Sequence, residues 1–264
     1  MPTPIYQVDA FTSAPFAGNP AGVALLDEPA ADAWMQSVAA EMNLAETAFL
    51  VRAGEGRYGL RWFSPTVEIP LCGHATLASA HVLWTEGRDS SDVLAFDTMS
   101  GELRARRLAA DGLIELDFPA NVAVDGPLDA AVIAALGVTP VRTAATDNGW
   151  LLVEVASAAE VRSCTPDLVA LGPITEHAVI VTAPGDDADI VSRVFAPASG
   201  IPEDPVTGSA HCVLATWWWD RVGRAVLDAE QASARGGRLL VVLDGDRVRL
   251  RGSAVTTLAG TLLV

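Results

Sequence analysis

The feature that most constrains the fold is a weak internal repeat between the two halves of the 264-residue chain. The segment Phe63-Ser-Pro-Thr-Val-Glu-Ile-Pro70 matches Phe195-Ala-Pro-Ala-Ser-Gly-Ile-Pro202 at the Phe, Pro, Ile and Pro positions. Further along, Gly73-His-Ala75 matches Gly208-Ser-Ala210. Each half therefore contains an apolar strand, a loop closed by proline, and an apolar helix that begins at a glycine. Such a repeat predicts two similar lobes with pseudo-twofold symmetry.

Short apolar runs bounded by glycine and proline alternate with a few helical stretches, a pattern typical of α+β proteins. The spacing of apolar residues predicts helices over 30–42, 75–86 and 128–136, and one from Ser209. Strands are predicted over 5–11, 23–26, 47–51, 58–63, 93–96, 103–107, 113–118, 141–145, 151–155, 178–182, 239–243, 248–251 and 257–263. The segment 119–127 predicts a linker, which gives lobes 1–119 and 120–264. The final strand, about 255–264, could cross back to the N-terminal lobe.

The chain contains no lysine, so all 17 of its basic residues are arginines. This excludes Schiff-base chemistry and a P-loop nucleotide site, both of which need a lysine amine. The net charge of −16 argues against binding to nucleic acid or to an anionic membrane surface. Neither a signal peptide nor an apolar run long enough to span a membrane is evident, so we expect a soluble cytoplasmic protein.

Two helices that begin at Gly73 and Gly208 occupy equivalent places in the repeat. A helix N-terminus offers unpaired backbone N–H groups and the positive end of the helix dipole. If both ends faced a cleft between the lobes, they would suit a small anion, above all a carboxylate. A small carboxylate substrate is therefore the hypothesis.

Glu46 lies in Asn43-Leu-Ala-Glu-Thr47, between a predicted helix and an apolar strand. Apolar neighbours would partly desolvate a carboxylate there, and burial raises a carboxyl pKa toward the range useful for proton transfer. An ordinary surface glutamate in a turn is the alternative. His74 begins a predicted helix beside Cys72 and matches Ser209 in the repeat, so functional and structural roles stay open.

The segment Glu203-Asp-Pro-Val-Thr-Gly-Ser209 is the least generic in the chain. Asp204 lies between two prolines just before the second helix, where an acidic cap is the alternative role. Ser209 could equally be an N-cap residue. The other three histidines, at 81, 177 and 211, give no sign of a metal site, because no two histidines are spaced i, i+4. The three cysteines form no CxxC pair, which argues against a disulfide framework or structural zinc.

The spacing of Gly54-x-Gly56-x-x-Gly59 matches the glycine pattern of a dinucleotide-binding fingerprint. That fingerprint must open a helix, whereas this one leads into the strand predicted over 58–63. A hairpin turn is the better interpretation, and no nicotinamide cofactor is expected.

Five motifs taken together resemble the PhzF family of phenazine-biosynthesis-like isomerases over essentially the full length. They are Phe16-Ala-Gly-Asn-Pro20, Asn43-Leu-Ala-Glu-Thr47, Phe63-Ser-Pro65, Leu71-Cys-Gly-His-Ala-Thr76 and Glu203-Asp-Pro-Val-Thr-Gly-Ser-Ala210. The resemblance implies a diaminopimelate-epimerase-like fold, in which each lobe is a curled β-sheet or barrel around a central helix. It also implies a homodimer that needs no cofactor.

The resemblance further implies roles for individual residues. The acid/base residue falls on Glu46, with His74 and Asp204 orienting the substrate. The backbone of Gly73 and Gly208 and the side chain of Ser209 would hold a carboxylate. In this hypothesis Glu46 removes a proton next to an unsaturated system and returns it elsewhere on the molecule.

Two rival hypotheses remain. A two-thiol racemase or epimerase of the same fold would use Cys72, but the matching position in the repeat is Thr207, which is not a thiol. Cys212 lies more than a helical turn further on and is expected in the core. A catalytically silent metabolite-binding protein is the other alternative.

Three consecutive tryptophans at 217–219 cannot all face one lobe core, because consecutive helix positions point about 100° apart. By its match to Trp84, Trp219 is expected to be the core member. Trp217 or Trp218 is then expected to face another apolar surface, in the second lobe or in a partner subunit.

Overall fold

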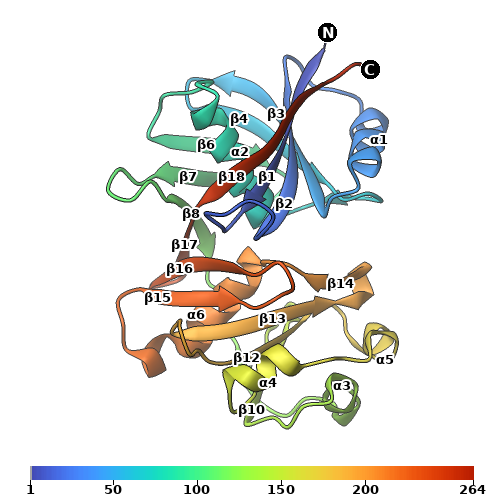
Figure 1. Ribbon diagram of the computed structural model, residues 1–264, viewed down its shortest axis with the longest axis vertical. Helices are drawn as coiled ribbons and strands as arrows, with labels where there is room; N and C mark the ends of the chain where they lie inside the picture. The colour runs from blue at the N-terminus through green and yellow to red at the C-terminus, as the bar shows by residue number, and fades with distance from the viewer. Residues whose placement is uncertain (1) are drawn as a thin grey trace. The chain divides into compact units, whose positions relative to one another are not determined.

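A computed structural model describes residues 2–264 and divides the chain into two compact units (Figure 1). Unit 1 contains the chain up to Phe118 together with Arg249–Val264, and unit 2 contains Pro119–Val248. The last sixteen residues therefore return to the unit in which the chain began. Within residues 2–264 no helix is long and apolar enough to cross a membrane.

Unit 1 is a curled sheet around one helix. Its helices are α1 (Asp32–Met42) and α2 (Gly73–Thr85). Its strands are β1 (Thr3–Ala10), β2 (Asn19–Leu26), β3 (Glu46–Gly54), β4 (Arg57–Phe63), β5 (Glu68–Ile69), β6 (Val93–Thr98), β7 (Gly101–Arg107), β8 (Ile114–Pro119) and β18 (Ala254–Leu262). They pair in the order β18-β1-β2-β3-β4-β6-β7-β8. Helix α2 contacts β18, β1, β2, β3 and β7, strands near both ends of that order, so the sheet wraps around it.

The composition of α2 explains its central place. Ten of its thirteen residues are buried, which is expected of a helix that is apolar on every side. Small residues such as Ala75, Ala78 and Ala80 let the surrounding strands approach closely, while Leu77 and Leu83 fill the space between. Helix α2 is thus fixed along its whole length, and its first residue is held in place.

Unit 2 has a mixed sheet with helices on its faces. Its helices are α3 (Ala130–Leu136), α4 (Ala158–Ser163), α5 (Leu168–Leu171) and α6 (Gly208–Val222), with short 3₁₀ turns η1 (Gly172–Ile174) and η2 (Pro197–Ser199). Its strands are β9 (Val124–Asp125), β10 (Arg142–Ala145), β11 (Leu151–Glu154), β12 (Val179–Pro184), β13 (Ile190–Ala196), β14 (Ile201–Asp204), β15 (Leu227–Gln231) and β16 (Gly237–Asp244). Strand β17 (Arg247–Gly252) leads back to unit 1.

The two units share one pattern of strand pairing. In unit 1, β2 and β3 are parallel, β3 and β4 antiparallel, β4 and β6 parallel, and β6 and β7 antiparallel. In unit 2 the same sequence of directions runs through β11, β12, β13, β15 and β16. Helix α2 joins β5 to β6, as α6 joins β14 to β15. The repeat in the sequence is therefore a repeat of topology, and the predicted α+β fold of two similar lobes is confirmed.

The hairpin predicted around Gly56 is also confirmed. Strands β3 and β4 pair antiparallel on either side of it, and Gly56 has a φ of 61°, a conformation that glycine adopts at little cost. The glycine string therefore opens a strand and not a nucleotide-binding helix.

The prediction for the three tryptophans is wrong. Trp217 and Trp218 are both buried inside unit 2, and Trp219 is partly exposed. The indole N–H of Trp217 donates to Glu154, and that of Trp218 donates to Thr182. These bonds to β11 and β12 turn the rings of Trp217 and Trp218 inward. The tryptophans therefore give no evidence for a partner subunit. The homodimer stays a prediction from the family resemblance.

Leu77→Ala tests whether α2 is the core of unit 1. Leu77 is fully buried, and truncation of such a side chain leaves a cavity inside the curled sheet. We expect the free energy of unfolding, measured by urea denaturation, to fall by about 2–5 kcal/mol. Leu258→Ala on β18 is the control, because that side chain is 49% exposed. Equal losses from the two variants would contradict the central position of α2.

Candidate active site

The end of helix α1 and the start of strand β3 determine the position of Glu46. Helix α1 ends at Asn43 in a left-handed conformation, with φ 50°, which an asparagine tolerates better than most residues. After that turn the chain enters β3 at Glu46, whose backbone pairs with Ala21 of β2. The residue is only 7% exposed, so the expectation that Glu46 is at least partly desolvated is confirmed.

His74 is the second residue of α2. Cys72, the residue before the helix, is extended, and its carbonyl accepts hydrogen bonds from the backbone N–H and the hydroxyl of Thr76. These bonds form the first turn of the helix. Its Nε2 atom lies 3.2 Å from Oε2 of Glu46. The structure thus brings together Glu46, Gly73 and His74, three residues singled out from the sequence.

Burial decides the charge of the imidazole. His74 is almost fully enclosed, and the loss of solvation lowers its pKa to about 3. At pH 7 the ring is therefore neutral, although a carboxylate lies beside it. A neutral imidazole carries a proton on one nitrogen and accepts at the other.

The neighbours of Nδ1 indicate which nitrogen carries the proton. The amide nitrogen of Asn19 lies 3.2 Å from Nδ1, and the Cys72 sulfur lies 3.5 Å from it. An amide N–H and a thiol S–H are both donors, so Nδ1 is the acceptor. The proton then resides on Nε2, which lies 3.2 Å from the Glu46 carboxylate but forms no hydrogen bond within the described residues.

Asn19 is a candidate site residue that reasoning from the sequence did not single out. It is fully buried at the start of β2, directly after a tight turn at Gly18. Gly18 has φ 65°, and a Cβ atom there would lie 2.2 Å from the carbonyl oxygen of Ala10. Only glycine fits this turn, which sets Asn19 against His74. The position of Asn19 in the Gly-Asn-Pro motif was the sequence signal that could have identified it.

Glu46, Cys72 and His74 also bring their possible metal-ligand atoms within 4.8 Å of one another. The Cys72 sulfur faces Nδ1 of the ring, however, and the Glu46 carboxylate faces Nε2. The cluster therefore offers three potential ligand atoms, with the thiol and the carboxylate beside different nitrogens of one ring.

In unit 2 the remaining predicted site residues gather at the start of α6. Asp204 ends β14, Gly208 is the first residue of α6, and Ser209 is exposed beside it. Thr207 precedes the helix, and its hydroxyl donates to Oδ2 of Asp204. The carbonyl of Thr207 accepts from Nδ1 of His211, which is fully buried.

The two other cysteines are poor candidates for proton transfer. Cys212 is buried in α6, with its sulfur 3.7 Å from the carbonyl oxygen of Gly208, and burial raises its pKa to about 12. Cys164 belongs to the apolar core of unit 2, where burial also raises the pKa of its thiol. Neither would supply a thiolate near neutral pH.

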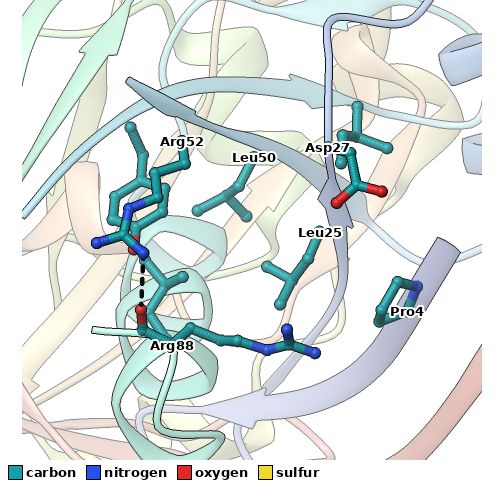
Figure 2. A pocket seen from close by; sticks show the side chains of 9 residues that line it. Pro4, Leu25, Asp27, Leu50, Arg52 and Arg88 are labelled. Atoms are coloured by element: carbon teal, nitrogen blue, oxygen red, sulfur yellow. Dashed lines mark hydrogen bonds between the residues drawn. The ribbon is translucent and has the colours of Figure 1, made fainter. Parts of the chain in front are cut away.

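A separate cavity of about 170 Å³ in unit 1 lies near the end of α2, between Leu25, Leu50 and the two arginines Arg52 and Arg88 (Figure 2). Arg52 already donates to the carbonyls of Gly54 and Arg88. The Tyr58 hydroxyl in its wall donates to Asp89, and burial together with that bond raises its pKa to about 12. The Tyr58 hydroxyl of this cavity therefore stays protonated at neutral pH.

The doubled topology, with a curled sheet around one helix, is that of the diaminopimelate-epimerase-like proteins. The crystal structure of a probable proline racemase from Agrobacterium radiobacter shares it, with a TM-score of 0.65 at 14% identity over 99% of this chain and 93% of that one. The fold thus defines the structural class.

Comparison of sequences gives the family. The family model of phenazine biosynthesis-like proteins, PhzC-PhzF, matches residues 8–260, and the chain belongs to that family. It is 48% identical to an uncharacterized isomerase of Pseudomonas aeruginosa, covering 97% of both chains. A crystal structure of a PhzF family protein from Enterococcus faecalis superposes with a TM-score of 0.95 at 40% identity, covering 100% of both chains. These relations support an isomerase or epimerase function.

The buried histidine of α6 predicts a pH effect on stability. Burial lowers the pKa of His211 to about 4, whereas an unfolded histidine titrates near 6.5. Between these values only the unfolded chain binds the proton, so stability falls as the pH falls. From pH 7 to pH 5, we expect wild type to lose about 2 kcal/mol more unfolding free energy than His211→Gln. Urea denaturation at both pH values measures this, and identical pH dependence in the two proteins would refute a neutral buried His211.

Proposed function

We propose that the protein is a cofactor-independent isomerase that moves a proton on a small amino-acid-like or cyclic carboxylate, with Glu46 as the acid/base group. One observation carries the proposal. A buried carboxylate lies 3.2 Å from a buried histidine at the N-terminus of a fixed helix. Catalytic acids and bases are found where burial and a specific partner act on the same group.

The reaction needs one group in two roles. As a carboxylate, Glu46 takes a proton from a carbon next to an unsaturated bond, and the C–H electron pair moves into a new π bond. The displaced π electrons form a bond to a proton at a more distant carbon, and the Glu46 carboxylic acid delivers that proton. Glu46 returns to the carboxylate, so no cofactor or external acid is consumed.

His74 supports this cycle as a neutral group. Its Nε2 lies 3.2 Å from Oε2 of Glu46 without forming a hydrogen bond, so in the proposal the Nε2 proton stabilises the carboxylate through its nearby partial positive charge before proton removal. Because burial keeps the ring neutral, His74 does not compete for the substrate proton. Asn19 and Cys72 hold the ring in this tautomer from the Nδ1 side.

The binding roles are assigned by the family motifs. Gly73 and Gly208 each begin a helix, and backbone N–H groups at a helix start suit a carboxylate. Ser209 adds a hydroxyl, and Asp204 would accept a hydrogen bond from a substrate amine. In the proposal, His74 and Asp204 orient the substrate while Glu46 does the chemistry.

A two-thiol racemase is less well supported. That mechanism needs a second thiol near the start of α6, where Thr207 stands, and the hydroxyl of Thr207 already donates to Asp204. Cys212 is buried, with a pKa raised to about 12. One-sided proton transfer by a carboxyl group therefore agrees better with the residues present.

Glu46→Gln tests the acid/base role. The amide keeps the size of the side chain but cannot accept and return a proton, so we expect turnover to fall by about 10²–10⁴-fold. The assay is a screen of small amino acids and cyclic carboxylates for deuterium incorporation in D₂O, followed by NMR. A silent binding protein would exchange no compound in the panel.

Glu41→Gln is the matched control for that variant, because Glu41 is exposed on α1. Both variants should unfold cooperatively and bind the same compound. Exchange by Glu46→Gln within about twofold of the control would remove Glu46 from the mechanism.

Cys72→Ser separates the carboxyl mechanism from a thiol mechanism. Serine keeps a donor toward Nδ1 of His74, so we expect most of the exchange rate to remain. A mechanism that needs the thiolate would lose nearly all activity, because a serine hydroxyl is a far weaker acid. Cys164→Ser, in the core of unit 2, controls for the loss of a buried thiol. Near-complete loss in a folded Cys72→Ser would favour the thiol mechanism.

A further inference from the structure

Gln231 is a fully buried amide at the end of β15 that bonds to the segment leading into α6. It reaches Asp204 and Thr207, 24 and more residues earlier in the chain, and forms three hydrogen bonds with them. Nearby, the hydroxyl of Ser233 donates to the carbonyl of Pro205. The segment 204–207 is therefore held from one side by the residues that follow β15.

Two backbone atoms fix the orientation of the Gln231 amide. The Thr207 N–H can only donate, and it lies 2.8 Å from Oε1 of Gln231. The Asp204 carbonyl can only accept, and it lies 2.7 Å from Nε2. A flipped amide would place donor against donor and acceptor against acceptor, so only one orientation fits.

This orientation fixes the direction of the next hydrogen bond. The second N–H of the amide points at the Thr207 hydroxyl oxygen, 3.1 Å away, which must therefore accept. A hydroxyl has only one proton to give, and that of Thr207 goes to Oδ2 of Asp204. Gln231, Thr207 and Asp204 form a chain of hydrogen bonds that runs in one direction and ends on a carboxylate.

We propose that Gln231 is a positioning residue that, through Thr207, favours the ionised form of Asp204 and fixes the position of its Oδ2. A hydroxyl that can only donate stabilises a carboxylate over a carboxylic acid. The role of Asp204 toward a substrate rests on the proposed function. The control of its ionisation by Gln231 does not.

The other ionisable groups around this segment are already engaged or neutral. Arg193 of β13 forms a two-pronged pair with Glu203, and Glu230 of β15 pairs with Arg162. On α6, His211 is held neutral by burial and Cys212 stays a thiol. Arg235 lies in the loop after β15 and forms interactions of its own. It is the charged group whose removal by Arg235→Gln serves as a comparison below.

The test follows the ionisation of Asp204 directly and needs no substrate. Protein labelled with ¹³C at aspartate side chains is titrated by NMR, and the Asp204 signal is identified by its loss in Asp204→Asn. In Gln231→Met the side chain keeps its length, and the Thr207 hydroxyl is no longer forced to donate to Asp204. We expect the midpoint of the Asp204 titration to rise by about one pH unit.

Gln231→Glu gives a sharper result. The introduced carboxylate can only accept, so it draws the Thr207 proton away from Asp204 and adds a negative charge nearby. The midpoint should rise further than in Gln231→Met. Thr207→Val removes the hydroxyl that donates to Asp204 but keeps the backbone N–H bond from residue 207 to Gln231. It should therefore also raise the midpoint of the Asp204 titration. This variant provides the test if the Gln231 variants fail to fold.

Thr182→Val is the control for a purely structural effect. It removes a buried hydroxyl that accepts from Trp218 in the same unit but does not touch segment 204–207. For Thr182→Val we expect lower thermal stability with an unchanged midpoint of the Asp204 titration. Arg235→Gln measures how far the charge of the Arg235 guanidinium affects that midpoint through space. An unchanged midpoint in Gln231→Met and Thr207→Val, or a smaller rise in Gln231→Glu than in Gln231→Met, overturns the inference.

Failure of the proposed function would look different. If Asp204→Asn exchanged deuterium into a substrate at the wild-type rate, Asp204 would have no part in catalysis, yet the titration shifts would remain. If the shifts were absent while Asp204→Asn was inactive, the proposed function would stand and the role of Gln231 would fall.

Discussion

The contact between the Glu46 carboxylate and the His74 imidazole sets the requirements that the rest of unit 1 meets. A carboxylate is costly to bury without donors, and a histidine that stays neutral offers only one. Asn19 and Cys72 lie beside Nδ1, so the ring proton is on Nε2, 3.2 Å from Glu46. The turn at Gly18, the start of α2 and the start of β3 position Asn19, His74 and Glu46 in turn.

The repeat explains why a second set of residues stands in the same structural context. Each unit ends a short strand, turns, and begins a buried helix at a glycine, at Gly73 in α2 and at Gly208 in α6. The chemistry differs between the two copies. Unit 1 carries a carboxylate against an imidazole, whereas in unit 2 a hydroxyl held by Gln231 donates to Asp204. In the proposed function, one topology thus supports a proton-transfer group in one copy and an oriented acceptor in the other.

Much of this could be predicted from the sequence, because local patterns encode it. The repeat, the glycine helix starts, the hairpin at Gly56 and the burial of Glu46 all follow from spacing and neighbours. The helices α4 and α5 were missed because six and four residues are too few to show a helical period. The inward turn of Trp217 depends on a bond to Glu154, and the role of Gln231 depends on a distant loop. Such tertiary partners leave no local signal.

The protonation state of His74 tests the account most directly, because the roles of Glu46, Asn19 and Cys72 all depend on it. Protein labelled with ¹⁵N at histidine can be examined by long-range ¹H–¹⁵N correlation NMR at pH 7, with His74→Asn identifying the signal. The account predicts a neutral ring with the proton on Nε2 and a bare Nδ1. A ring protonated on both nitrogens, or on Nδ1 alone, would contradict it.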